Sequence, residues 1–286
     1  MTKLTLEPGV LRVASAFPDP PFEVAAGGER TGFDMELMRL MCDDLGLSLR
    51  PVPYSGDDFD GIFAGLENGN YDAVISGTTI TPEREKMVLF SAPYLQFDQG
   101  LAVNVRLNPK IKTSDDLRGL VVGIQVGNTS DLVARRLLAR GAIKNIEYYP
   151  YHGILTALDD LSAGRIGALI KLYPVISWLV KDRAELGVIE QIPTHEKLGI
   201  AFARTNPGLC LAVNESLARI KKSGRFEALR SKWFDESRGA QVGDQAHPSL
   251  HRRRWPVALL RGRDRVERSH GPQRDVPRRP GPRHQL

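Results

Sequence analysis

The stretch Ser76–Arg84 combines residue types that can hold a carboxylate. Gly77, which follows Ser76, lets the backbone approach a ligand closely, and the Thr79 hydroxyl lies beside it. Arg84 offers a planar guanidinium that can bind both oxygens of a carboxylate. The same residues also suit an ordinary strand-to-helix connection, with Thr81 as N-cap and Pro82 in the first helical turn. Taken alone, the stretch favours the connection; the rest of the chain favours a binding site.

A second polar loop, Val126–Ser130, precedes a helix expected over Asp131–Arg140. Its residues Gly127, Asn128 and Thr129 would then lie at the N-terminus of that helix. Free N–H groups and the positive end of the helix dipole favour an anion there. Thr129 is also a normal N-cap residue, and the two roles are compatible.

Strand-like and helical segments alternate along the chain, which predicts an α/β fold with mostly parallel sheets. Expected strands are Val10–Ala14, Leu47–Val52, Tyr71–Ile75, Leu101–Val105, Val121–Gln125, Ile146–Tyr149, Ala168–Ile170 and Val188–Gln191. Expected helices are Phe33–Leu45, Phe59–Glu67, Asp131–Arg140, Ile154–Ala163, Val175–Lys181, Pro207–Ile220 and Arg225–Phe234. The loop–strand–polar loop–helix pattern occurs once in each half, at Ser76–Arg84 and at Val126–Asp131.

Composition suits two packed lobes and offers no metal or redox centre. The chain has 286 residues, 42% of them hydrophobic, and no apolar run reaches the ~18 residues of a membrane helix. Two cysteines make no disulfide framework, and Cys42 falls in a helical apolar pattern, which predicts a buried free thiol. The six histidines lack ligand spacing, so we expect no metal and no cofactor. Residues 1–9 show no signal-peptide pattern.

The formal charge of +5 is concentrated at the C-terminus. Residues 238–286 hold twelve arginines and four acidic residues, a net charge of +8, which leaves about −3 for the rest of the chain. We therefore predict no nucleic-acid partner for the folded part. Proline, arginine and glycine dominate residues 237–286, which we predict to be a disordered tail. A nucleic-acid-binding tail, or an out-of-frame reading of a GC-rich gene, are the alternatives for this segment.

Several motifs together resemble the type II solute-binding proteins of ABC importers for polar amino acids. The stretch Gly32-Phe33-Asp34-Met35-Glu36-Leu37, continued by Met41-Cys42 and Leu45, resembles the signature of that family. Supporting motifs follow in the family's order: Pro20–Phe22, Asp58–Ile62, Gly69–Ala73, Ser76–Arg84, Phe90–Tyr94, Gly123–Thr129, Ala163–Arg165 and Lys232–Phe234. The resemblance covers residues 9–236.

The resemblance implies a clamshell of two α/β lobes joined by two crossing hinge strands, which closes on its ligand. Lobe 1 would comprise residues 9–99 and 198–236, and lobe 2 residues 100–197. The protein would bind its solute as a monomer and deliver it to an ABC permease in the membrane. It would act outside the cytoplasmic membrane, although the missing export signal leaves a cytoplasmic protein as the alternative.

The resemblance also implies ligand-binding roles for individual residues. The Gly77 carbonyl and Thr79 would hold the α-ammonium and carboxylate of an amino acid, and Arg84 would clamp the carboxylate. Thr129, with Gly127 and Asn128, would grip the same carboxylate from the second lobe. Phe59 would form an aromatic shelf for the ligand's side chain; its alternative is a core position on a helix.

Two departures from the family pattern limit the prediction of the substrate. Leu172, preceded by Lys171, stands where many members carry an aspartate that pairs with the ligand's ammonium. In the first lobe Ala16 replaces an aspartate found in binders of cationic amino acids, and Asp19 replaces an aromatic residue. A buried ammonium without a carboxylate partner is costly. One interpretation is that Asp19 supplies the missing carboxylate. Another is that the ligand lacks an amino group or carries a second acidic group that pairs with Lys171. A further alternative is that Lys171 is a snorkelling surface residue.

Other functions fit the residues less well. Cyclohexadienyl dehydratase resembles this family, but its elimination needs a general acid, and Lys171–Pro174 offers neither a carboxylate nor a histidine. We therefore predict no catalytic residue and no enzyme. A ligand-sensing receptor module would need a transmembrane or signalling segment, which the sequence does not show.

Overall fold

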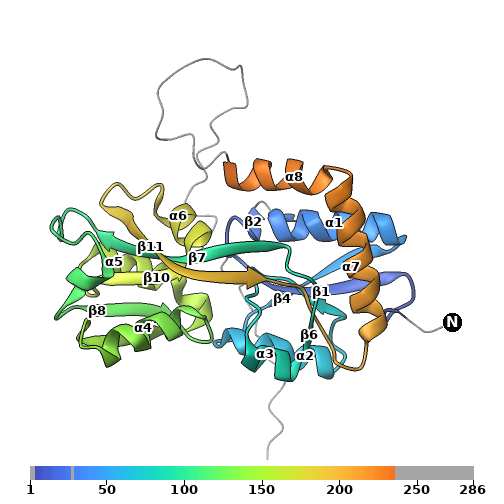
Figure 1. Ribbon diagram of the computed structural model, residues 1–286, viewed down its shortest axis with the longest axis horizontal. Helices are drawn as coiled ribbons and strands as arrows, with labels where there is room; N and C mark the ends of the chain where they lie inside the picture. Colours follow the sequence, from blue (N-terminus) through green and yellow to red (C-terminus); the bar gives the residue numbers. More distant parts are fainter. Residues whose placement is uncertain (1–3, 27–28, 236–286) are drawn as a thin grey trace, which may run out of the picture.

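The computed structural model describes residues 4–26 and 29–235, which form two α/β lobes (Figure 1). Each lobe is built around a five-stranded sheet. This confirms the predicted two-lobed α/β fold. The predicted tail, residues 237–286, lies outside the described residues.

The first lobe contains the sheet β4-β1-β5-β12-β6. Its strands are β1 (Val10–Ala16), β4 (Ser48–Tyr54), β5 (Ala73–Val74), β6 (Leu89–Phe90) and β12 (Ala201–Phe202). Its helices are α1 (Phe33–Leu45), α2 (Ala64–Glu67), α3 (Pro82–Met87), α7 (Pro207–Lys222) and α8 (Arg225–Arg230). Helices α1, α7 and α8 pack their apolar side chains on one face of the sheet. The 3-10 helix Phe59–Phe63 and α2 cover the other face. A short hairpin, β2 (Val24–Ala26) and β3 (Glu29–Thr31), precedes α1.

The second lobe contains the sheet β11-β7-β10-β8-β9. Its strands are β7 (Leu95–Asn104), β8 (Val121–Gln125), β9 (Asn145–Tyr149), β10 (Ala168–Leu172) and β11 (Leu186–Leu198). Its helices are α4 (Ser130–Ala139), α5 (Ile154–Ser162) and α6 (Tyr173–Val180). Helix α4 packs on one face of this sheet, and α5 and α6 pack on the other.

The prediction of mostly parallel sheets is wrong. In the two large sheets β1 pairs in parallel with β4 and β5, and β8 with β9 and β10. The pairs that involve β7 or β12 are antiparallel. The reason is connectivity. The chain leaves the first lobe through β7 and returns to it through β11, so β7 in the second sheet and β12 in the first sheet run opposite to the strands beside them.

Strands β7 and β11 lie side by side across the gap between the lobes (Figure 1). Both are longer than predicted, because their pairing continues from the sheet into the connection between the lobes. The β11 register shifts between Val188 and Glu190 and again between Ile192 and Glu196, which obscures any regular alternation in the sequence. The lobe boundaries at residues 99–100 and 197–198 remain predictions.

Gly32 sets the backbone that precedes α1. Its φ is 118°, a conformation that L side chains rarely adopt, and a Cβ there would overlap the Phe22 carbonyl oxygen. This close approach lets Asp34 N–H donate to the Phe22 carbonyl (3.1 Å) and Phe33 N–H to the Pro21 carbonyl (2.9 Å). At the other end of α1, Gly46 caps the helix with φ 67°.

Both cysteines, Cys42 and Cys210, are free and buried, as predicted for Cys42. Among the described residues no helix has the length and hydropathy of a membrane span. The same residues contain no group of three or more His, Cys, Asp or Glu side chains that could hold a metal ion.

We expect Gly32→Ala to lower the free energy of unfolding by a few kcal/mol, because the new Cβ would displace the backbone that begins α1. Gly46→Ala is the matched control: its Cβ would meet no atom within 4 Å, so it carries only the left-handed strain of about 1 kcal/mol. Urea denaturation of both variants measures the difference. If the two variants lose the same free energy of unfolding, the close contact between Gly32 and Phe22 does not add to the cost of the substitution.

Candidate functional site

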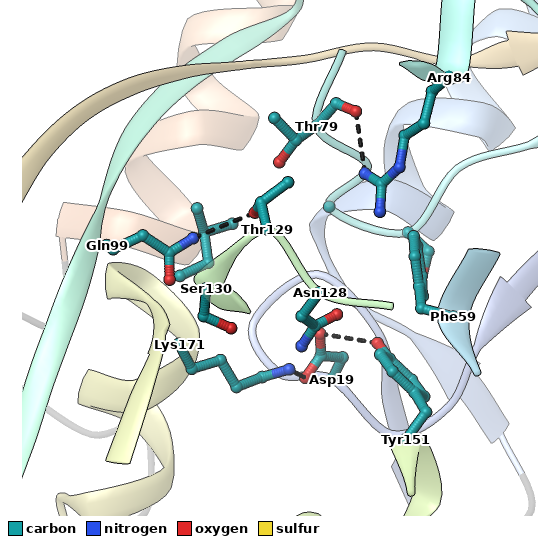
Figure 2. A pocket seen from close by; sticks show the side chains of 13 residues that line it. Asp19, Phe59, Thr79, Arg84, Gln99, Asn128, Thr129, Ser130, Tyr151 and Lys171 are labelled. Atoms are coloured by element: carbon teal, nitrogen blue, oxygen red, sulfur yellow. Dashed lines mark hydrogen bonds and ion pairs between the residues drawn. The ribbon is translucent and has the colours of Figure 1, made fainter. Parts of the chain in front are cut away.

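Residues from both lobes line one cavity at the junction of the lobes (Figure 2). The first lobe contributes Asp19, Phe59, Ser76, Gly77, Thr79 and Arg84, and the second contributes Asn128, Thr129 and Lys171. Gly127 lies beside the cavity and contacts Arg84 through its carbonyl. The structure therefore brings together all the residues for which the sequence predicted a ligand-binding role. The cavity is about 30 Å³, the space of one or two waters.

Arg84 is held by partners from both lobes. Its Nε and Nη2 contact Asp60 Oδ1 at 2.9 and 2.8 Å, and its Nη1 donates to the Thr79 carbonyl at 2.9 Å. Its Nη2 also donates to the Gly127 carbonyl of the second lobe at 2.9 Å. The Thr81 hydroxyl accepts the Arg84 N–H at 3.2 Å, so the predicted N-cap is confirmed and it positions the arginine. A solute carboxylate would compete with Asp60, whose side chain is 44% exposed, for this guanidinium.

Gly127 allows the two lobes to touch beside Arg84. Its φ is 79°, and a Cβ there would collide with the Asp58 carboxylate and with the Phe59 N–H. The Phe59 N–H donates to the Val126 carbonyl at 3.2 Å across the same contact. The lobes are therefore in close contact here in this structure.

Three backbone N–H groups beside the cavity are free donors. The N–H groups of Thr79, Thr129 and Ser130 donate to no atom of residues 4–26 and 29–235. Two of them lie at the N-terminus of α4, where the helix dipole favours an anion. Together with Arg84 they can bind a carboxylate from both lobes. Thr129 occupies the N-cap position of α4, as predicted, but its side chain makes no capping hydrogen bond to the helix.

Lys171 and Asp19 form a buried ion pair between the lobes. The Lys171 Nζ lies 2.9 Å from Asp19 Oδ1 and donates to Gln125 Oε1 at 2.7 Å. Lys171 is 3% exposed, so the snorkelling interpretation is wrong. Tyr151 donates its hydroxyl to Asp19 at 3.0 Å, and its ring lies 5.3 Å from the lysine nitrogen. Burial and the neighbouring Asp19 charge raise the Tyr151 pKa, so the phenol keeps its proton.

Phe59 is buried between charged and aromatic neighbours. Its ring centroid lies 5.1 Å from the Arg84 guanidinium carbon and 5.1 Å from the Tyr151 ring. The ring also belongs to the apolar cluster with Phe63 and Ala16. Phe59 therefore lines the cavity and contributes to the core, so both interpretations of this residue describe part of its environment.

Sequence reasoning missed four polar residues of the site: Gln99, Ser130, Tyr151 and Glu196. Glu196 accepts hydrogen bonds from Thr79 Oγ1 at 2.6 Å and from Thr129 Oγ1 at 2.7 Å. Gln99 Nε2 donates to the other Glu196 oxygen at 2.7 Å. Gln99 lies on β7 and Glu196 on β11, where the sequence shows only ordinary strand residues. Their proximity to Thr79 follows from the pairing of Thr78–Ile80 with the end of β11.

Glu23 and Asp34 form a buried acidic pair, and Asp34 binds the backbone of the cavity residue Gly77. Asp34 Oδ2 accepts from the Gly77 N–H at 2.8 Å and from the Tyr94 hydroxyl at 3.1 Å. Burial raises the pKa of Asp34 to about 7. Burial, with the nearby Asp34 and Asp19 charges, also raises the pKa of Glu23 well above its ordinary value. The pair therefore keeps a proton near neutral pH.

Comparison with protein families gives one match over most of the chain. The sequence model of the bacterial extracellular solute-binding proteins, family 3, matches residues 11–236.

Individual relatives agree with this match. The chain is 31% identical over 232 residues to "Putative ABC transporter arginine-binding protein 2" of Escherichia coli K12, covering 79% of this chain and 91% of that protein. It is 31% identical over 232 residues to "L-cystine-binding protein TcyJ" of the same strain, covering 80% and 84%. The solved structure of "An ancestral arginine-binding protein bound to arginine" is 33% identical, with a TM-score of 0.72 over 79% of this chain and 98% of that one.

We expect the free energy of unfolding to fall as pH rises from about 5 to 8. Glu23 and Asp34 have ordinary pKa values of 4.5 and 3.8, and folding raises both. Their contribution is complete below pH 4 and is lost as pH rises through about 7, because the folded protein must then either hold a proton that the unfolded chain has released or bury two negative charges. Glu23→Gln should flatten this dependence, because the amide cannot bind or release a proton in this pH range.

Urea denaturation at several pH values measures this effect. Glu67→Gln, at an exposed position of α2, is the control and should keep the wild-type dependence. A Glu23→Gln variant with the wild-type slope would contradict the role of the acidic pair.

Proposed function

The chain belongs to the bacterial extracellular solute-binding proteins, family 3, and we propose that it is the solute-binding component of an ABC importer. It captures a small solute that bears a carboxylate, an amino acid or a close analogue, and its lobes close on that solute. Its partner is an ABC permease in the membrane, and it acts as a monomer outside the cytoplasm. The named relatives support this proposal, since they bind arginine or cystine.

One observation carries the proposal: donors for a carboxylate converge on one cavity from both lobes. Arg84 and the Thr79 N–H come from the first lobe, and the free N–H groups of Thr129 and Ser130 come from the second. Hydrogen bonds to a charged acceptor contribute roughly 1.5–3 kcal/mol each, so a carboxylate bound by both lobes would favour the closed form. The solute would replace Asp60 as the partner of Arg84.

We infer a binding role for the cavity rather than an enzymatic one. The titratable side chains that line the cavity are Asp19, Arg84, Tyr151 and Lys171. Asp19 and Lys171 neutralise each other, and Tyr151 keeps its proton. This arrangement supports solute recognition by fixed hydrogen bonds, which accords with the named relatives.

Calorimetric titration of the protein with the twenty L-amino acids and with simple dicarboxylates tests the function. We expect at least one member of the panel to bind with a dissociation constant in the micromolar range or below. If the protein is open before the solute binds, small-angle X-ray scattering should show a smaller radius of gyration with the solute than without it. Absence of binding across the panel would contradict the proposal.

We expect Arg84→Ala to weaken binding of that solute by about tenfold to a hundredfold or more, because charge-assisted contacts are lost. Arg84→Lys should recover only part of the affinity, since a lysine keeps the charge but not the planar pair of donors. Arg135→Ala is the control: this arginine is 65% exposed on α4 and pairs with Asp131, away from the cavity. Wild-type affinity in the Arg84→Ala variant would remove this residue from the site.

A further inference from the structure

A second cavity lies between α6 and the residues that follow α8, where these two helices approach each other in Figure 1. Its described lining includes side chains of α6 and its C-cap, from Tyr173 to Lys181, and of the segment from Arg230 to Asp235; we call it the α6 cavity. Its volume is about 650 Å³, within the range of about 300–1,000 Å³ for pockets that bind small molecules. It shares no described lining residue with the cavity beside Arg84, so it is a separate feature of the fold.

One face of α6 forms a wall of this cavity. Tyr173, Ser177 and Lys181 are spaced four residues apart, so their side chains lie on the same face of the helix. Trp178 lies beside Ser177 and lines the cavity as well. Ile176, in contrast, lies in the apolar core of the second lobe. The helix therefore packs on its own lobe with one face and presents polar and aromatic side chains to the cavity with another.

Polar groups on this wall are not committed to other side chains. Within residues 4–26 and 29–235, the Tyr173 and Ser177 hydroxyls and the Lys181 ammonium make no hydrogen bond or ion pair. The Lys181 Nζ instead lies 3.3 Å from the centroid of the Trp178 ring. Burial lowers the pKa of Lys181, and the neighbouring Asp182 charge opposes this effect. An ammonium in this position would gain from a close counter-charge.

The opposite wall is aromatic and comes from the first lobe. Trp233 and Phe234 belong to the short helical segment Ser231–Asp235 that follows α8, and both line the cavity. The Trp233 ring lies 6.3 Å from the ring of Trp178 on α6. Aromatic surfaces of the two lobes therefore meet in the cavity, and such surfaces favour a flat apolar group.

Cationic side chains outnumber acidic ones in the described lining of the α6 cavity. Lys181, Arg230 and Lys232 line it, whereas Asp235 is the one acid among these residues. Arg230 pairs with Asp235, and Lys232 pairs with Glu36 on α1, which leaves Lys181 on the other wall. The cavity therefore disfavours a cation and favours a negative charge near Lys181. The C-terminal end of α6 opposes an anion there, but a helix end carries only about half an elementary charge.

We propose that the α6 cavity binds a small organic acid with a flat apolar body, such as an aromatic carboxylate. Its acidic group accepts hydrogen bonds from Lys181 and Ser177, and its body packs against Trp178 and Trp233. Because the two walls belong to different lobes, this ligand contacts both. The site is separate from the one proposed for the transported solute, and it is tested without that solute.

Two dyes that differ in charge test the site. Anilinonaphthalene sulfonate carries one negative charge on an aromatic body, and phenylnaphthylamine has the same rings without the charge. Two of the chain's three tryptophans, Trp178 and Trp233, line the cavity, and the third is Trp255. In a Trp255→Phe background, dye bound in the α6 cavity should quench the remaining tryptophan emission with saturation at one dye per chain.

Substitutions on α6 should separate the role of the charge from that of the ring. We expect Lys181→Gln to weaken the sulfonate about tenfold and to leave the affinity for the neutral dye unchanged, because only the charge-assisted contact is lost. Trp178→Ala should weaken both dyes by about tenfold, because the aromatic surface is lost. Lys222→Gln is the matched control: this exposed lysine on α7 lies outside the cavity, so both affinities should stay as in the parent protein.

Thermal denaturation establishes that each variant is folded. Absence of saturable quenching by the sulfonate would overturn the proposal, as would a folded Lys181→Gln variant that keeps its affinity for the sulfonate or weakens both dyes alike. An Arg84→Ala variant that loses the sulfonate while Trp178→Ala retains it would place the dye in the cavity beside Arg84, which also overturns the proposal. None of these results bears on the proposed importer function, because no solute takes part in the measurement.

Discussion

The site depends on one constraint: a guanidinium that is 4% exposed must find anionic or carbonyl partners. Arg84 finds them in Asp60, in the Thr79 carbonyl and in the Gly127 carbonyl of the second lobe. The partners of this one buried charge therefore come from both lobes. Gly127 permits the close approach, because any Cβ would collide with Asp58 and Phe59.

The other buried charges of the cavity also need partners. The Lys171–Asp19 pair crosses between the lobes and neutralises itself, which removes both groups from the recognition of a charged solute. Lys171 occupies the carboxylate of Asp19 in this structure, which disfavours the interpretation that Asp19 pairs with an ammonium of the solute. The interpretations that concern the solute itself, a missing amino group or a second acidic group, stay predictions. The carboxylate of Glu196 is held by neutral donors from each lobe and from the connection between them.

Local signals in the sequence predicted much of the framework. The apolar spacing of Phe33–Leu45 and the glycine that follows predicted α1 and its end, and Thr81 with Pro82 predicted the start of α3. These features depend on a few neighbouring residues, so they are readable without the fold. Strand direction and the length of β7 and β11 depend on which strands pair across long separations, and the predictions for these were wrong.

The amino-acid sequence indicated which residues could meet a carboxylate, because Arg84, Thr79 and the Gly127–Thr129 loop carry that chemistry in their side chains and backbone. It also showed that Leu172 could not bind an ammonium. Tertiary structure decided how the charges are distributed: Lys171 is matched with Asp19, and Glu196 lies beside Gln99 and Thr79. Glu196 and Thr79 are 117 residues apart in the chain, and their contact exists because the end of β11 pairs with the Thr78–Ile80 segment. Such a contact depends on sheet register and lobe closure, which no local pattern of residues encodes.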